Sequence, residues 1–149
     1  LCDRAARSGH SFQKLVFPQY SEPSSALIRM YLGGEFGSHP GDVNPYAASS
    51  FYAVDRYASF KKVWGTFYQS GGLVLTDRYT TSNAVHQAVK CAPEIHELDA
   101  GYLAACRSCA LQAAQLLNWQ VVRCVDGEGR LRSIQSIHEE IWSLAEPLL

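Results

Sequence analysis

Three short runs of apolar and β-forming residues, separated by helical stretches, restrict the folds open to this chain. The runs are Phe12–Phe17, Leu73–Thr76 and Trp119–Val125. A Pro, Asp or Asn residue borders each of them, which is typical of short buried strands. Strands that alternate with helices favour an α/β fold, in which a parallel β-sheet is flanked by helices on both faces. We therefore expect one domain over residues 1–149.

Local start and stop signals mark the helices. Asn44-Pro45 is the strongest start, because a capping Asn precedes a Pro at the first helical position. This helix should run to Gly71-Gly72, and apolar side chains on two of its stripes predict that it is largely buried. Ser24 is expected to cap a helix that ends at Leu32.

Composition excludes several classes of protein. The formal net charge is -1, so no overall field attracts nucleic acid or an anionic membrane. No apolar run reaches the length of a membrane span, and the first residues do not form a secretory signal. A cytoplasmic protein without a nucleic-acid or membrane partner is the prediction. Cys106 and Cys109 form a C-x-x-C inside an alanine-rich helical stretch, which favours core residues over zinc ligands or a redox pair.

Polar residues follow the first two predicted strands. Pro18 and Gln19 come after the first strand, and Asp77-Arg78 end the second. In parallel sheets, ligands bind beyond these carboxyl ends. An aspartate there can organise Mg²⁺ through its water shell, and an arginine can hold phosphate oxygens in bidentate fashion. A structural ion pair that caps the next helix explains the same two residues.

Tyr52 and Arg56 are four positions apart on the long helix, so the ring and the guanidinium share one face. Such a face suits a ligand with a planar base and a phosphate. The alternative is that Tyr52 belongs to the core and that Arg56 pairs with Asp55 or a glutamate.

Three motifs in order resemble those of a known enzyme family. Phe17-Pro18-Gln19-Tyr20, Phe51-Tyr52-Ala53-Val54-Asp55-Arg56 and Asp77-Arg78-Tyr79-Thr80-Thr81-Ser82-Asn83 look like the successive nucleotide-monophosphate motifs of thymidylate kinases. The resemblance covers nearly the whole chain. It implies a P-loop kinase fold and transfer of the ATP γ-phosphoryl group to thymidylate (dTMP), with Mg²⁺ as cofactor and dTDP as product.

The resemblance also implies roles for single residues. Arg56 and Arg78 would hold the acceptor phosphate, Tyr52 would stack on thymine, and Asn83 would contact the base edge. Arg78 and Asp77 are the implied catalytic residues, and Asp77 and Glu97 the implied metal ligands. The implied substrate-binding residues are Phe17, Pro18, Tyr20, Tyr52, Arg56, Arg78, Asn83, His86 and Gln87.

The chain departs from the family pattern in two ways. Gln19 stands where the family usually has a basic residue, and the sequence contains no G-x-x-x-x-G-K-[ST] loop for the donor phosphates. We expect a P-loop strand before Leu1 and a strand-plus-lid segment near residues 90–93 to be absent from the chain. The alternatives are a deoxynucleoside or other pyrimidine monophosphate kinase, or an inactive thymidylate-binding homologue.

The family usually forms two-fold dimers, so the resemblance also implies a homodimer. Tyr57, Phe60 and Trp64 are candidates for its interface. Core packing explains these three aromatic residues equally well.

Overall fold

The computed structural model describes residues 1–39, 42–90 and 100–149. Most of these residues are helical, and the described part holds a single two-stranded sheet. The helices are α1 (Cys2–Arg7), α2 (Ala26–Leu32), α3 (Pro45–Ser59), α4 (Gly65–Gln69), α5 (Thr80–Lys90), α6 (Ala100–Leu116) and α7 (Ile134–Ala145). Shorter helical turns cover Pro23–Ser25 and Glu146–Leu148.

The two strands are parallel neighbours. β1 (Phe12–Val16) pairs with β2 (Leu73–Asp77), with Phe12 opposite Leu73 and Val16 opposite Asp77. The core of the molecule lies at this sheet, where Leu15, Phe17 and Trp64 are buried together and Phe60, Val74 and Tyr79 pack against them. The first two predicted strands are therefore present, in parallel pairing.

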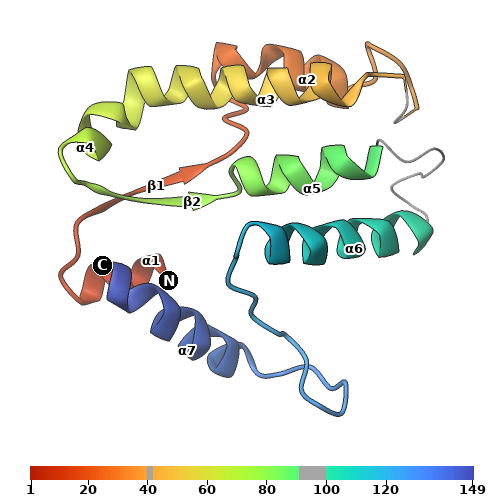
Figure 1. Cartoon of the computed structure of the whole chain (residues 1–149). Helices are drawn as coiled ribbons and strands as arrows, with labels where there is room; N and C mark the ends of the chain where they lie inside the picture. The colour runs from red at the N-terminus through yellow and green to blue at the C-terminus, as the bar shows by residue number, and fades with distance from the viewer. Residues whose placement is uncertain (40–41, 91–99) are drawn as a thin grey trace.

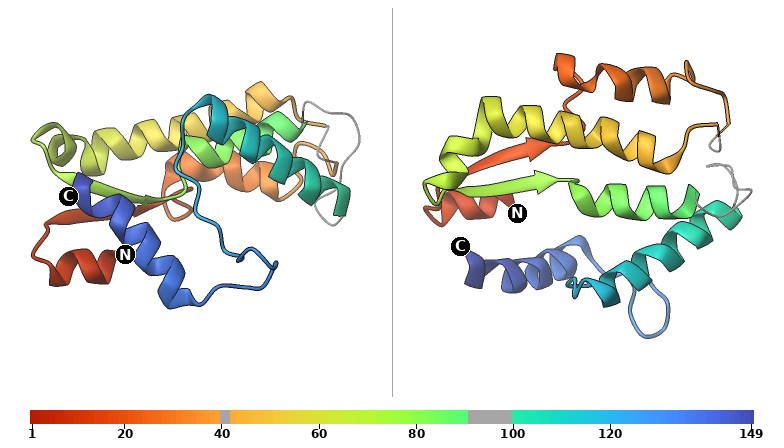
Figure 2. Two further views of the ribbon diagram at one scale, coloured as in Figure 1. Left: turned by 60° about the horizontal axis from the view of Figure 1, so that its bottom comes forward. Right: turned by 45° about the horizontal axis from the view of Figure 1, so that its top comes forward.

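The helices pack largely on one another (Figures 1 and 2). α2 lies along α3, and α5 follows β2 and lies between α3 and α6. At the other end of the molecule α1 and α7 lie side by side, joined by an ion pair between Arg4 and Glu139. The predicted parallel sheet with helices on both faces is wrong, because two strands cannot form a layer that separates these helices.

The third predicted strand, residues 119–125, is absent for a local reason. Its end folds back through a turn at residues 126–130, and Val125 forms an isolated antiparallel bridge with Leu131. Val121 and Val125 remain 53% and 44% exposed, so the run gains no burial beside β1 or β2. The run contains β-forming residues, but its end pairs with the segment at Leu131, directly after the turn.

The long helix that starts at Asn44-Pro45 is correctly predicted. The Asn44 side chain accepts a hydrogen bond from the Tyr46 N–H at 2.8 Å, and α3 continues through a π-helical stretch at Phe60–Trp64 into α4. Gly65 permits this wide stretch, since a Cβ there would lie 2.5 Å from the Phe60 carbonyl oxygen. The burial of the helix is only partly as expected, because Val54 and Tyr57 are more than half exposed.

Two smaller predictions are also corrected. Ser24 lies in the short turn Pro23–Ser25 and does not cap α2; its hydroxyl bonds to Asp55 instead. Of the three proposed dimer residues, Trp64 is 7% exposed and packs edge-on against Phe60 at 4.8 Å between ring centroids. These two residues belong to the core, whereas Tyr57 is 64% exposed.

Candidate functional site

The carboxyl ends of β1 and β2 meet, as the sequence predicts for two parallel strands. The Phe17 N–H donates a hydrogen bond to the Asp77 carbonyl oxygen at 3.1 Å. The Phe17–Pro18 peptide bond is cis. The segment that follows β1 therefore lies directly beside Asp77 and Arg78, and this edge of the sheet is the centre of the candidate site.

Arg78 has an unusual backbone conformation at this edge. Its φ angle is 63°, in the left-handed region that non-glycine residues seldom occupy. Such a conformation costs on the order of 1–3 kcal/mol and persists only where the surroundings enforce it, often at binding sites. The Arg78 side chain is exposed and makes no hydrogen bond or ion pair with any residue in the described part of the chain. It does not cap α5 as one half of an ion pair, which was the structural alternative.

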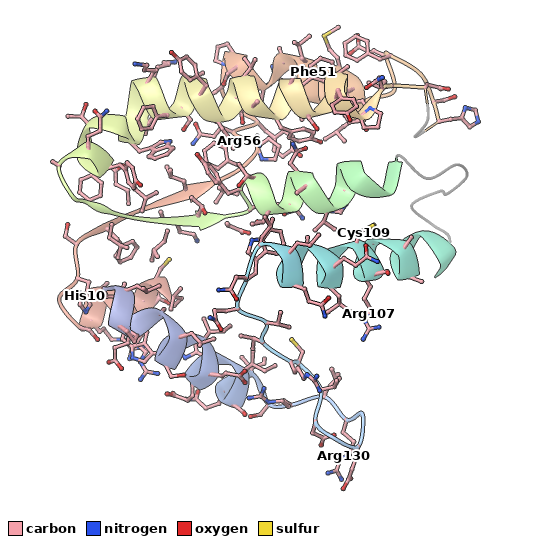
Figure 3. The ribbon with its side chains drawn as sticks, in the orientation of Figure 1. His10, Phe51, Arg56, Arg107, Cys109 and Arg130 are labelled. Atoms are coloured by element: carbon pink, nitrogen blue, oxygen red, sulfur yellow. The ribbon has the colours of Figure 1, made fainter. Side chains whose placement is uncertain are left out.

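Tyr79 joins the two strand ends to the long helix. Its ring lies 5.6 Å from the Phe17 ring and 6.3 Å from the Trp64 ring, measured between centroids. The Arg56 guanidinium carbon lies 5.6 Å from the centre of the same Tyr79 ring. Figure 3 shows Arg56 on the side of α3 that faces α5. Arg56 thus contacts the ring of Tyr79, the residue that directly follows Arg78 in the chain.

Arg56 is half-buried without a carboxylate partner. Burial lowers the pKa of its guanidinium from the ordinary value, an effect that Tyr79 and Asp55 partly oppose. Arginine stays protonated under all physiological conditions, so the charge remains at a partly desolvated position. No ion pair with an acidic side chain joins Arg56 within residues 1–39, 42–90 and 100–149. A half-buried cation in this position favours binding of an external anion.

Asp55 is the residue that sequence reasoning missed. It is 1% exposed, although it stands on a helix whose apolar stripes suggested a different buried face. Its carboxylate accepts hydrogen bonds from the Gln19 N–H at 2.9 Å and from the Ser24 hydroxyl at 2.7 Å. The interpretation that Arg56 pairs with Asp55 therefore fails. The Asp-Arg sequence on a helix was the only available signal, and it does not reveal which way each side chain turns.

The predicted base-binding residues lie on α3 and α5, which pack against each other. Tyr52 is half-buried one turn before Arg56. On α5, the side-chain oxygen of Asn83 is buried and has no partner among the described residues. An unsatisfied buried acceptor of this kind is uncommon and suits a donor on a ligand.

Other predicted residues stand further from this arrangement. Tyr20 is half exposed, and its carbonyl oxygen accepts a hydrogen bond from Arg29 at 2.6 Å. His86 lines an open surface pocket of roughly 450 Å³ whose wall includes Trp119 and Gln120. The side chain of Gln87 and the whole of Glu97 lie outside the described residues, as does most of the expected break near residues 90–93.

The metal prediction rests on one carboxylate in the described structure. Asp77 is exposed at the end of β2, and no group of three or more His, Cys, Asp or Glu side chains gathers around it or elsewhere in the described part. Mg²⁺ commonly uses one or two carboxylates together with substrate phosphates and water. Asp77 fits such a role only if a nucleotide supplies the other ligands.

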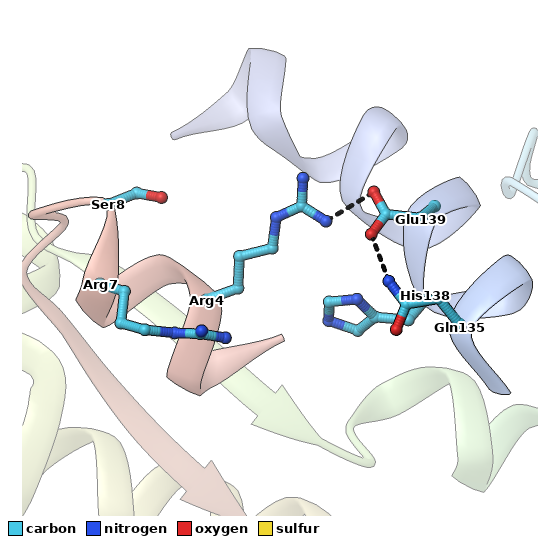
Figure 4. Close-up of a pocket in the computed structure, with 6 residues that line it drawn as sticks. All are labelled: Arg4, Arg7, Ser8, Gln135, His138 and Glu139. Carbon is cyan, nitrogen blue, oxygen red and sulfur yellow. Dashed lines mark hydrogen bonds and ion pairs between the residues drawn. The ribbon is translucent and has the colours of Figure 1, made fainter.

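A second pocket, of roughly 500 Å³, lies between α1 and α7 (Figure 4). Arg4 enters it, but its guanidinium is already engaged by Glu139 at 2.7 Å and stacks over Trp142 at 4.4 Å. The other Glu139 oxygen accepts from the Gln135 amide at 2.8 Å. These contacts join the first helix to the last, so this pocket has a structural explanation and the strand-end site remains the candidate.

Comparison with known proteins gives no match that bears on this site. No family model matches the sequence, and no curated protein matches it either. None of the helices in the described part of the chain has both the length and the apolarity that crossing a bilayer requires.

Proposed function

We propose that this chain carries the nucleotide-acceptor site of a thymidylate kinase. Thymidylate would bind at the carboxyl ends of β1 and β2, with its 5′-phosphate between Arg56 and Arg78. The observation that carries the proposal is Arg56, a half-buried guanidinium held against Tyr79 with no acidic partner in the described structure. The choice of thymine as the base comes from the three ordered sequence motifs.

The arrangement suits phosphoryl transfer to a monophosphate. That reaction requires positioning and neutralisation of charge more than covalent chemistry by the protein. Arg56 would supply a fixed charge from the helix, and Arg78 an exposed charge from the strand end. Together they would screen the acceptor dianion so that one of its oxygens can approach the donor phosphate. Mg²⁺, bound near Asp77 with ATP, would supply charge neutralisation on the donor side.

Binding is the decisive measurement, because the 149 residues contain no donor-phosphate loop of the G-x-x-x-x-G-K-[ST] type. Calorimetric titration should show thymidylate binding more tightly than thymidine, which lacks the phosphate that the arginines would hold. Deoxyuridylate and deoxycytidylate should bind more weakly than thymidylate. Equal affinity for all three monophosphates would favour a kinase of broader pyrimidine specificity, and no binding of any of them would end the proposal.

The two arginines can be tested separately. Arg56→Gln and Arg78→Gln should each cost about 1.5–3 kcal/mol of thymidylate binding, the usual range for a lost charged hydrogen bond. Arg130→Gln is a matched control, because Arg130 pairs with Asp126 and Glu128 in the C-terminal turn. It should leave the affinity unchanged. Thymidine should lose little affinity in the first two variants, since it brings no phosphate.

The homodimer remains part of the proposal. Of the three predicted interface residues, Tyr57 is exposed on α3 and remains available for such an interface. Sedimentation analysis of the chain and of Tyr57→Glu would test it, with a monomeric wild-type protein as the contrary result.

A further inference from the structure

The loop that follows β1, residues 17–25, is tied to three helical elements. Asp55 on α3 accepts hydrogen bonds from the Gln19 N–H and the Ser24 hydroxyl. Arg29 on α2 donates to the Tyr20 carbonyl oxygen at 2.6 Å. Lys62, in the π-helical stretch, pairs with Glu22 at 3.1 Å. The loop therefore has a defined shape set by contacts distant in sequence.

Asp55 differs from the other two ties. Lys62 and Glu22 are 65% and 39% exposed at their side chains, and exposed pairs of this kind contribute little. Asp55 is 1% exposed, so its carboxylate has exchanged water for two protein donors. Removal of a buried acceptor of this kind leaves a donor unpaired, and that loss is costly. Arg29 is exposed as well, so Asp55 is the one buried charged side chain among the three contacts that hold the loop.

The two groups that donate hydrogen bonds to Asp55 lie near opposite ends of the loop. Gln19 follows Pro18 at the end of β1, and Ser24 belongs to the turn that leads into α2. A single carboxylate therefore fixes the loop at both sides.

Asp55 and its neighbour Arg56 point to different sides of α3. Successive helical residues point about 100° apart, so Asp55 faces the loop while Arg56 reaches Tyr79. The Asp55 carboxylate is directed at Gln19 and Ser24 and forms no ion pair with Arg56, although its charge still acts on the guanidinium. The same helical turn can thus hold the loop and leave the guanidinium available to an anion.

We propose that Asp55 is a positioning residue, which locks the loop after β1 to the helix turn that carries Arg56. The two walls of the nucleotide site then keep a fixed spacing before the nucleotide arrives. This inference rests on the proposed function, because the spacing matters only if thymidylate binds between these walls. Preorganisation of this kind raises affinity by removing the cost of ordering the loop on binding.

Two substitutions separate the effect of the hydrogen bonds that Asp55 accepts from the effect of its negative charge. Asp55→Ala removes both acceptors. Asp55→Asn keeps the tie in a neutral form, because its amide oxygen can accept from the Gln19 N–H while its amide nitrogen donates to the Ser24 hydroxyl, which can also accept. Asp55→Ala should weaken thymidylate binding by about tenfold or more, the range for a lost hydrogen bond to a charged group. Asp55→Asn should restore the affinity to within about threefold of wild type.

The full chain serves for all measurements, with thymidylate as the probe and titration calorimetry as the readout. Asp126→Ala is the matched control, since Asp126 also accepts backbone hydrogen bonds, from Glu128 and Arg130, but lies in the C-terminal turn. It should bind thymidylate as the wild type does. Thermal melts establish that each variant is folded at the temperature of the titration, and hydrogen exchange of the Gln19 amide reports on the tie itself. That amide should exchange faster in Asp55→Ala than in Asp55→Asn.

The outcomes separate the two proposals. If wild type binds thymidylate and folded Asp55→Ala binds equally well, Asp55 is only structural and the inference fails while the proposed function stands. If Asp55→Asn is as weak as Asp55→Ala, the charge matters and the tie does not, which also overturns the inference. If wild type does not bind, the proposed function fails and the inference falls with it. Should Asp55→Ala not fold, Ser24→Ala decides: a loss of a few fold supports the tie, and unchanged affinity contradicts it.

Discussion

Residues 12–83 and residues 116–149 are held together in different ways. In the first region the decisive contacts join segments far apart in sequence, such as Gln19 with Asp55 and the Phe17 ring with the Tyr79 ring. In the second region most polar contacts are local, such as Arg130 with Asp126. Several large apolar side chains are also exposed there, among them Leu116, Leu131 and Ile134, each more than 80%.

This difference tells where a binding site can be preorganised. Contacts between distant segments fix the relative positions of several elements at once, whereas local contacts fix only a turn. The first region can therefore hold Arg56, Arg78 and Asn83 in a defined arrangement. Beyond its local contacts, the second region is joined to α1 through Arg4, which contacts Glu139 and Trp142.

The largest expected effect comes from the core of the first region. Trp64→Ala should lower the free energy of unfolding by about 3–5 kcal/mol, because it removes a large ring from between Phe60 and Tyr79. Ile134→Ala, at a side chain that is 88% exposed, should change it by less than about 0.5 kcal/mol. Denaturant titration measures the free energy of unfolding of both variants. Similar losses in the two would show that the regions do not differ as described.

A smaller effect is expected at Tyr79, whose ring Arg56 contacts. Tyr79→Leu removes a cation–π contact that holds Arg56 in place and is worth about 1–2 kcal/mol when partly desolvated. Because Arg56 would no longer be fixed before the phosphate arrives, thymidylate binding should weaken, by at most roughly thirtyfold. Tyr57→Leu is the control, since Lys61 lies over this ring at 5.9 Å but the residue is 64% exposed and outside the site. A loss of affinity in the control, or none in Tyr79→Leu, would contradict the assignment of the site.

Helix caps offer a comparison in which the two regions should behave alike. The side chains of Asn44 and Ser133 each accept a backbone N–H at the start of α3 and α7. Substitution of either by Ala should cost about 1 kcal/mol, because a cap acts only within its own first turn. Thermal unfolding of the two variants provides the test. A much larger loss for Asn44→Ala would mean that the order of the first region begins at this cap.

The smallest effect is a pH dependence between α1 and α7. The hydrogen bond from Arg4 lowers the pKa of Glu139 below its ordinary value of 4.5, with the charge of Arg4 and His138 adding to this. Because the folded pKa is depressed, the stabilisation is present above pH 4.5 and is lost as the pH falls through the lower folded value. The melting temperature should decline less steeply over this range in Arg4→Met than in wild type. An identical decline in both proteins would show that the ion pair contributes nothing.

Local signals predicted the elements of the first region well. The Asn44-Pro45 helix start and the β1 and β2 runs are all present, because capping and burial of short apolar runs depend on nearby residues. The meeting of the strand ends also followed, since parallel neighbours bring their carboxyl ends together.

The failures involve the choice of partner, which local propensity does not determine. Ser24 had the chemistry of a helix cap but found a buried acceptor 31 positions away, in Asp55. The run at residues 119–125 had strand propensity but paired with Leu131 across a turn and not with the sheet. The direction in which Asp55 and Arg56 turn depends on tertiary contacts, so the sequence alone left their pairing open.

The π-helical stretch at Phe60–Trp64 acts as a phase shift within one continuous helix. A π turn holds about one residue more than an α turn, so it rotates everything after it by roughly 100° relative to a regular helix. Arg56, before the stretch, and Trp64, at its end, can therefore both meet Tyr79. If the same residues formed a regular α-helix, Arg56 and Trp64, which are eight positions apart, would point roughly 80° apart. The two side chains could then no longer both reach the Tyr79 ring.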